Sequence, residues 1–132
     1  MTHERRRPVT RKLAASTLDK FRGKLEDERQ RLSDLLAVHA REREEARLSE
    51  TSSERIPDPT TAEGGSMAFE YEKELSVDQN LEDLLAKVNR ALVRMDEGGY
   101  GICEVCGEAI PFERLDVLPH ATMCVTDAAR AR

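Results

Sequence analysis

The cysteine-rich segment from Gly98 to Asp127 constrains the fold of this chain more than any other feature. All three cysteines of the protein lie in it: Cys103, Cys106 and Cys124. The first two form a C-x-x-C-G knuckle, a spacing at which two thiolates can reach one metal ion from a tight turn. Gly107 stands where the backbone must fold back toward that ion without interference from a Cβ atom. The segment therefore predicts a small metal-binding finger.

The fourth ligand of such a finger is left open by the sequence. A structural zinc site of the paired C-x-x-C type requires a ligand at position 127, and that residue is Asp127. The three thiolates could be completed by Asp127 or by His120, or the site could hold metal weakly or not at all. Without metal, the cysteines could form one disulfide and leave one free thiol. A redox C-x-x-C requires a βαβ context, which the pattern does not show.

The composition does not suit a conventional globular core. Aromatic residues make up 4% and charged residues 36% of the chain, and there is no Trp. These values suit long solvated helices with a narrow apolar seam, joined to a small metal-stabilised unit. The formal net charge of −5 argues against duplex DNA as the main partner, because neutralising phosphates requires a basic surface.

The sequence also predicts where the protein resides. The basic start is not followed by the apolar stretch of a signal peptide, and no long apolar run could span a membrane. We therefore expect a cytoplasmic protein without a membrane partner, in which the thiols stay reduced and available to zinc.

Two helical segments are predicted between a basic arm and the finger. Residues 1–15 are expected to form a disordered arm, and Ser16 is the expected N-cap of the first helix. A polar tip loop over 51–66, with Pro57 and Pro59, separates this helix from a second one that ends near Glu97. The seam positions recur at three- and four-residue steps, with Glu28 occupying one of them in the first helix. The others are Leu18, Phe21, Leu25, Leu32, Leu35 and His39 in the first helix, and Met67, Tyr71, Leu81, Leu85, Val88, Leu92 and Met95 in the second.

This repeat is typical of a coiled coil. His39 is interpreted as a solvated seam residue, and Glu74 and Asp78 as polar interruptions of the second seam. The expected fold is mainly α: a long antiparallel two-helix coiled-coil hairpin over 16–97, with a small zinc-ribbon-like finger over 98–127 at its base and a tail over 128–132. We expect a monomer.

The finger resembles that of a known family. The pattern G-x-YG-x-C-x-x-CG-x-x-IP-x-ERL-x-x-LP-x-AT-x-C, which runs from Gly98 to Cys124, is similar to the zinc finger of the DksA/TraR family of bacterial RNA polymerase regulators. The preceding helical hairpin also fits that family. The resemblance extends over roughly residues 16–127. The sequence departs from the family pattern at position 127, where Asp127 replaces the usual fourth Cys.

The resemblance implies a partner and a mode of action. Such a protein binds RNA polymerase directly, inserts its coiled coil into the secondary channel and brings an acidic tip toward the catalytic Mg²⁺. Counted back from Cys103, the family's tip motif D-x-x-D-x-A falls on Thr60, Glu63 and Gly65, with Asp58 two residues upstream of the first position. Asp58 and Glu63 are therefore the expected polymerase-contacting carboxylates.

The expected function is regulation of transcription initiation, with structural zinc held by Cys103, Cys106, Cys124 and Asp127. The alternatives are a non-catalytic coiled-coil interaction module and a zinc-finger nucleic-acid binder; sequence-specific DNA binding is not expected. No Ser/His/Asp set, phosphate-binding loop or HExxH motif is present, so an enzyme is not predicted.

Overall fold

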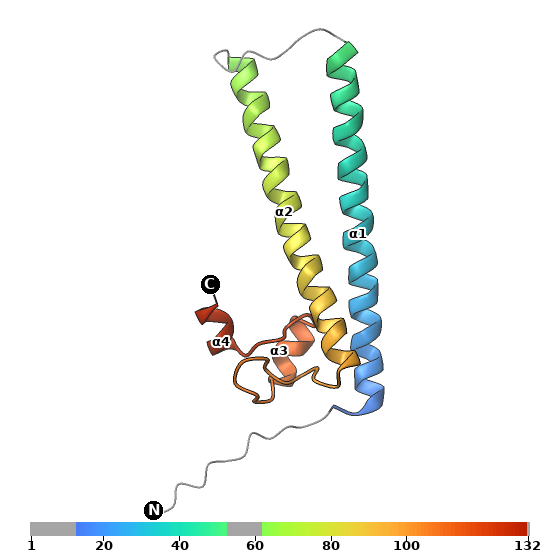
Figure 1. Cartoon of the computed structure of the whole chain (residues 1–132), viewed down its shortest axis with the longest axis vertical. Helices are drawn as coiled ribbons and strands as arrows, with labels where there is room; N and C mark the ends of the chain where they lie inside the picture. The colour runs from blue at the N-terminus through green and yellow to red at the C-terminus, as the bar shows by residue number, and fades with distance from the viewer. Residues whose placement is uncertain (1–12, 53–61, 132) are drawn as a thin grey trace, which may run out of the picture. The chain divides into compact units, whose positions relative to one another are not determined.

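The computed structural model describes residues 13–52 and 62–131, with side chains described over 13–49 and 65–131. Two long helices, α1 (Ala15–Ser52) and α2 (Ala62–Asp96), precede two short ones, α3 (Phe112–Val117) and α4 (Val125–Arg130) (Figure 1). The described residues contain no β-strand, and the finger has a single antiparallel bridge between Ile102 and Ala109. The prediction of a mainly helical protein with two long helices is confirmed.

Several predicted boundaries differ from the structure. The loop predicted over 51–66 is shorter at both ends, because α1 runs through Ser52 and α2 begins at Ala62. Gly64 and Gly65 each cost the helix about 1 kcal/mol relative to Ala, which did not suffice to end it. Of the basic arm predicted over 1–15, residues 1–12 lie outside the described part of the chain.

The predicted helix start and C-terminal tail also need correction. The first backbone bond of α1 runs from the Leu18 N–H to the Ala14 carbonyl, at 3.0 Å, so Ala14 and not Ser16 precedes the helix. At the other end of the chain, residues 128–130 belong to α4 and not to a tail. This helix continues past the finger boundary because Ala128, Ala129 and Arg130 are good helix formers.

The described residues form two compact units. We call residues 13–29 with 86–131 the finger unit, and residues 30–52 with 62–85 the coil unit. In both units α1 and α2 run antiparallel: Arg22 pairs with Asp96 in the finger unit at 3.0 Å, and His39 pairs with Asp78 in the coil unit at 2.6 Å. No described helix is apolar enough, over a sufficient length, to cross a membrane.

The finger unit contains most of the core. Phe21 of α1 is 1% exposed, and its ring lies 5.8 Å from both the Tyr100 and Phe112 rings, measured between centroids. The other buried apolar residues of this unit come from both long helices and from the finger: Leu25, Val88, Ala91, Leu92, Cys103, Ile110, Leu115 and Ala121. The ends of the long helices and the finger therefore share one core.

The coil unit buries far fewer apolar side chains than the finger unit. Leu32 is its one fully buried apolar side chain among the described residues. Met67 and Tyr71, both predicted to lie in the seam, are 48% and 56% exposed. The predicted seam is therefore correct for Phe21, Leu25, Leu32, Val88 and Leu92, and wrong for the start of α2, where the described side chains over 65–77 are all exposed.

Candidate metal centre

The turn after α2 positions the first two cysteines. The Cys103 N–H donates to the Glu108 carbonyl at 2.8 Å, and the Gly107 N–H donates to the Cys103 carbonyl at 3.1 Å. Gly107 has a φ of 74°, a left-handed conformation that glycine adopts without a steric penalty. The expected fold-back at Gly107 is present, but it requires glycine for its backbone conformation and not for space, because an added Cβ atom would meet nothing within 4 Å.

Helix α4 positions the other two candidate ligands. Cys124 is the N-cap residue of α4, and Asp127 lies in its first turn. Residues three apart on a helix lie on the same face, so the thiol and the carboxylate point the same way. Asp127 is 9% exposed, which is unusual for an acidic residue without a partner.

The four side chains meet in one cluster. The sulfur atoms of Cys103, Cys106 and Cys124 and a carboxylate oxygen of Asp127 all lie within 4.8 Å of one another. Asp127 Oδ2 is 3.1 Å from the Sγ atoms of both Cys103 and Cys124, and the Sγ atoms of Cys106 and Cys124 are 3.9 Å apart. His120 is not part of the cluster, so the structure favours Asp127 as the fourth ligand.

The cluster fits tetrahedral zinc. With Zn–S bonds of about 2.3 Å and a Zn–O bond of about 2.1 Å, the ligand atoms of a tetrahedral site lie roughly 3.5–3.8 Å apart. The observed separations bracket that range. Three thiolates and one carboxylate are also a set of ligands that zinc accepts, and four protein ligands leave no open coordination position. The chemistry offered is that of a structural site, which stabilises the fold.

The ionisation of the cluster suits a cation. Hydrogen bonds from the Cys103 and Cys124 thiols lower the pKa of Asp127, so it is a carboxylate. Burial raises the pKa of Cys103, but backbone N–H groups of Cys106 and Cys124 outweigh this effect and lower it overall. For Cys106, a backbone hydrogen bond that favours the thiolate is outweighed by burial and by its neighbours in the cluster, which raise its pKa to about 12. A bound cation replaces these protons, because zinc binds thiolates and not thiols.

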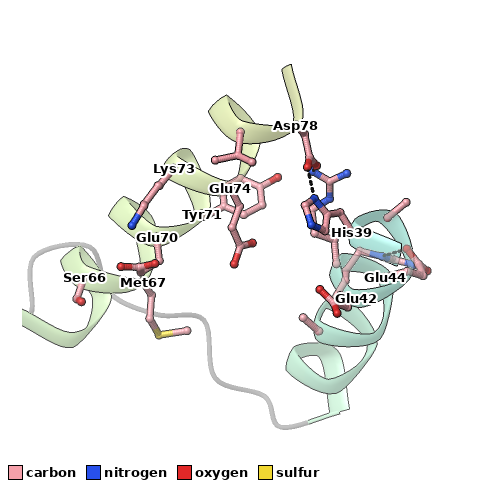
Figure 2. Close-up of a pocket in the computed structure, with 15 residues that line it drawn as sticks. His39, Glu42, Glu44, Ser66, Met67, Glu70, Tyr71, Lys73, Glu74 and Asp78 are labelled. Atoms are coloured by element: carbon pink, nitrogen blue, oxygen red, sulfur yellow. Dashed lines mark hydrogen bonds and ion pairs between the residues drawn. The ribbon is translucent and has the colours of Figure 1, made fainter. Parts of the chain in front are cut away.

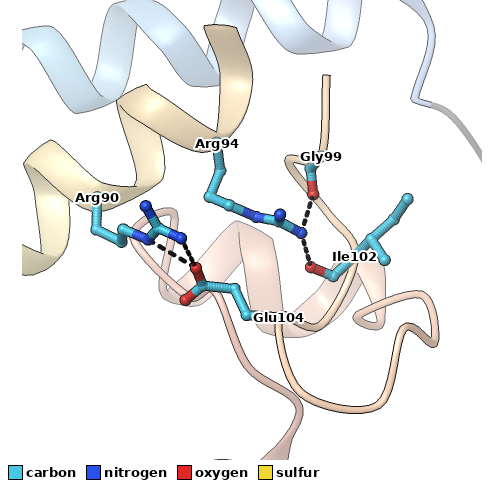
Figure 3. Close-up of polar contacts among 5 residues, drawn as sticks. All are labelled: Arg90, Arg94, Gly99, Ile102 and Glu104. Atoms are coloured by element: carbon cyan, nitrogen blue, oxygen red, sulfur yellow. Dashed lines mark hydrogen bonds and ion pairs between the residues drawn. The ribbon is translucent and has the colours of Figure 1, made fainter. Parts of the chain in front are cut away.

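Arg94 of α2 connects the helix to the loop that carries the knuckle (Figure 3). Its Nη2 atom donates to the carbonyl oxygens of Gly99 and Ile102, each at 3.0 Å. A Cβ atom at position 99 would come within 2.6 Å of this guanidinium group, so a larger residue there would require the end of the Arg94 side chain to move. Arg90, one turn earlier, reaches Glu104 instead, with its Nε atom 2.6 Å from Oε1 (Figure 3).

We expect Arg94→Met to lower the free energy of unfolding of the finger unit by about 2–3 kcal/mol, because hydrogen bonds from a charged donor to two carbonyl groups are lost. Arg90→Met is the matched control. Its ion pair with Glu104 is half exposed on the arginine side, so its loss should cost at most about 1 kcal/mol. Urea denaturation of both variants measures the two values, and equal losses would contradict the role given to Arg94.

The candidate tip residues lie at the edge of what the structure describes. Asp58 and Thr60 lie outside the described residues. Glu63 lies in the first turn of α2, but its side chain is outside the described part. Gly65 is an exposed residue of α2. The polymerase-contacting role of Asp58 and Glu63 therefore stays a prediction.

The structure reveals a polar cluster that the sequence reading missed. Asp78, interpreted as a polar interruption of the seam, is 5% exposed. His39 Nδ1 lies 2.6 Å from its Oδ1 (Figure 2), and Arg43 forms an ion pair with Oδ2. His39 is thus a partner of a buried carboxylate and not simply a solvated seam residue. The spacing of His39 and Arg43, four residues apart on one helix face opposite an acidic seam position, was the available signal.

The comparisons with known proteins agree with this architecture. A family model described as "Prokaryotic dksA/traR C4-type zinc finger" matches residues 98–129. General stress protein 16O of Bacillus subtilis (strain 168) is 41% identical over 64 residues, which cover 48% of this chain and 39% of that protein. The RNA polymerase-binding transcription factor DksA of Caulobacter vibrioides is 42% identical over 52 residues, which cover 39% of this chain and 37% of that protein.

These two matches thus span less than half of each relative's length. The similarity in structure extends further. The structure of transcription factor DksA2 from Pseudomonas aeruginosa is similar with a TM-score of 0.67 and 29% identity, over 89% of this chain and 84% of that one. The finger thus matches the DksA/TraR-type zinc finger over residues 98–129, and the fold is similar to that of DksA2 over most of the chain.

Proposed function

We propose that the protein is a transcription regulator that binds RNA polymerase and has no catalytic activity of its own. The observation that carries this proposal is the combination of a DksA/TraR-type finger with a fold similar to DksA2 over most of the chain. A relative that is 42% identical over 52 residues is named for its binding to RNA polymerase.

The proposed mechanism assigns separate tasks to the two ends of the long helices. Cys103, Cys106, Cys124 and Asp127 hold a structural zinc ion that stabilises the finger. The segment between α1 and α2, which contains Asp58, and the first turn of α2, which contains Glu63, enter the secondary channel of the polymerase. Carboxylates suit that place, because they can pair with basic groups or perturb the charges around the catalytic metal ions. The many acidic residues of α2, among them Glu70, Glu72 and Glu74, add to the negative charge of this end.

Binding is tested by capture of purified core polymerase with the zinc-loaded protein and by competition with a Gre-type cleavage factor, which occupies the same channel. Capture that the competitor abolishes supports the proposal. Failure to capture polymerase at micromolar concentration would overturn it. If the competitor had no effect, the binding site would lie outside the channel.

The tip is tested by the double variant Asp58→Asn, Glu63→Gln. We expect it to lose its effect on transcription from a responsive promoter, while its affinity for polymerase changes by less than about tenfold, or about 1.4 kcal/mol. The matched control is Glu82→Gln, Asp83→Asn, which removes two exposed carboxylates from α2 away from the tip. Normal regulation by the tip variant would contradict the role of both residues.

A second candidate function, self-association through the coil, is favoured by the large exposed apolar side chains of α2. Phe69 is 65% and Tyr71 56% exposed, and large apolar side chains left open to solvent can pack against a second copy of the helix. Light scattering distinguishes self-association from the proposed regulator function, for which we expect a monomer at micromolar concentration. A stable dimer that Phe69→Ala dissociates would support self-association.

A further inference from the structure

Asp78 is the acidic side chain in the described residues that is buried without belonging to the metal centre. Asp78 and Asp127 are the two buried charged residues of this part of the chain. The metal centre accounts for Asp127. An isolated buried carboxylate is costly, and Asp78 is therefore expected to be paired and to have a definite structural task.

Two side chains of α1, one from His39 and one from Arg43, contact the Asp78 carboxylate. His39 Nδ1 contacts Oδ1 at 2.6 Å, and Arg43 forms an ion pair with Oδ2. The hydrogen bond with His39 lowers the pKa of Asp78, burial opposes this shift, and the charge of Arg43 reinforces it. Asp78 is therefore a carboxylate held by two residues one helical turn apart. We call His39, Arg43 and Asp78 the Asp78 clasp.

The clasp occupies the last buried position on the loop side of the coil unit. On α2, every described side chain over 65–77 is exposed, and Asp78 is the first buried one. On α1, every described side chain over 44–49 is exposed. A groove of about 920 Å³ lies between the two helices here, lined by residues such as Met67, Tyr71 and Glu74 (Figure 2). Beyond the clasp, the helices bury none of these side chains against each other.

This arrangement leaves the loop-side segments with little else to hold them. In proteins, most helix stability comes from packing of a buried face, and short helices without such packing are marginal in water. Hydrogen bonds and ion pairs of exposed residues contribute only tenths of a kcal/mol each. The buried, charge-assisted contacts of Asp78 are stronger, and removing one partner leaves a buried polar group unpaired.

We infer that the Asp78 clasp holds the loop-side segments of α1 and α2 together, so that breaking it releases residues 65–77 of α2 from the coil unit. The device is local: the finger unit has its own apolar core and stays folded when the clasp opens. If the proposed function holds, the clasp also limits the motion of the helix ends that carry the tip residues toward the polymerase. The inference itself concerns the protein alone and does not depend on polymerase.

The test is hydrogen exchange of the zinc-loaded full chain, labelled at pH 7 from subsecond times and measured by mass spectrometry. In Asp78→Asn, we expect amides over 65–77 to exchange at least about tenfold faster than in the wild type, because the local opening free energy falls. Amides of α2 over 86–96 in the finger unit should change less than about twofold. Glu74→Gln is the matched control: it removes an exposed carboxylate one turn away in the same groove and should have no effect.

Two outcomes would overturn the inference. One is unchanged exchange over 65–77 in Asp78→Asn, and the other is equal acceleration in the finger unit, which would indicate global unfolding. Arg43→Gln provides a milder variant of a half-exposed residue. It should accelerate the same amides by itself and add little to Asp78→Asn, because both break one clasp. Fully additive effects would also contradict the inference. No polymerase is present, so the result is independent of the test of the proposed function.

Discussion

Removal of zinc is expected to destabilise the finger unit at least as much as truncation of its largest buried side chain does. Structural zinc contributes about 10–16 kcal/mol in zinc-finger peptides, whose apolar cores are minimal. Here Phe21, Leu115 and their neighbours form a core that persists in part, so we expect a loss of about 3–6 kcal/mol in the free energy of unfolding. Chemical denaturation before and after treatment with a chelator measures the loss, and metal analysis should find about one zinc per chain in the untreated protein.

Variants of the fourth ligand make this prediction specific. Asp127→Ala should lose zinc to a chromophoric chelator at much lower chelator concentration than the wild type. Asp127→Cys should hold zinc at least as tightly, because it completes a set of four thiolates. His120→Gln is the control, since His120 lies outside the cluster. Loss of zinc in His120→Gln together with retention in Asp127→Ala would refute the assignment of the fourth ligand.

Phe21→Ala is expected to lower the free energy of unfolding by about 3–5 kcal/mol, the usual cost of truncating a buried Phe. Phe21 is 1% exposed and contacts the rings of Tyr100 and Phe112, so its loss leaves a cavity where α1 meets the finger. Urea denaturation followed by circular dichroism measures the change, and the finger-unit amides should lose protection from hydrogen exchange as well.

Phe69→Ala is the matched control for this prediction. The same substitution at a residue that is 65% exposed should change stability by less than about 0.5 kcal/mol. If both variants lost the same free energy, the shared core of the long helices and the finger would not be what stabilises the protein. If Phe21→Ala weakened α1 while the finger amides stayed protected, the finger would fold independently of α1.

The parts of the fold that the sequence predicted are governed by local spacing. The knuckle of Cys103, Cys106 and Gly107 is a property of a short turn, and a seam position such as Leu25 follows from helical periodicity alone. The helix boundaries near the tip were less accurate, because Gly64 and Gly65 weaken a helix without forcing it to end.

The sequence alone does not decide whether Asp127 or His120 is the fourth zinc ligand. Both are possible zinc ligands, and both lie close to Cys124 in the sequence. The backbone of α4 places Asp127 beside Cys124, and the packing of the finger brings both to Cys103. The sequence supplied the ligand types, and the tertiary structure selected among them.

At the start of α2, the sequence pattern predicts buried seam residues that the structure shows to be exposed. Met67 and Tyr71 have the spacing of buried positions, but they are exposed, because periodicity identifies one face of a helix and not whether another helix covers it. The pairing of Asp78 with His39 and Arg43 joins residues far apart in the chain, which no local pattern records. The sequence by itself therefore determined the long helices, the finger and its thiol ligands. Only the tertiary structure decided which seam residues are buried, which side chain lies with the three thiols and which residues pair with Asp78. Burial and pairing depend on contacts between segments that are distant in the sequence, and a local pattern does not contain them.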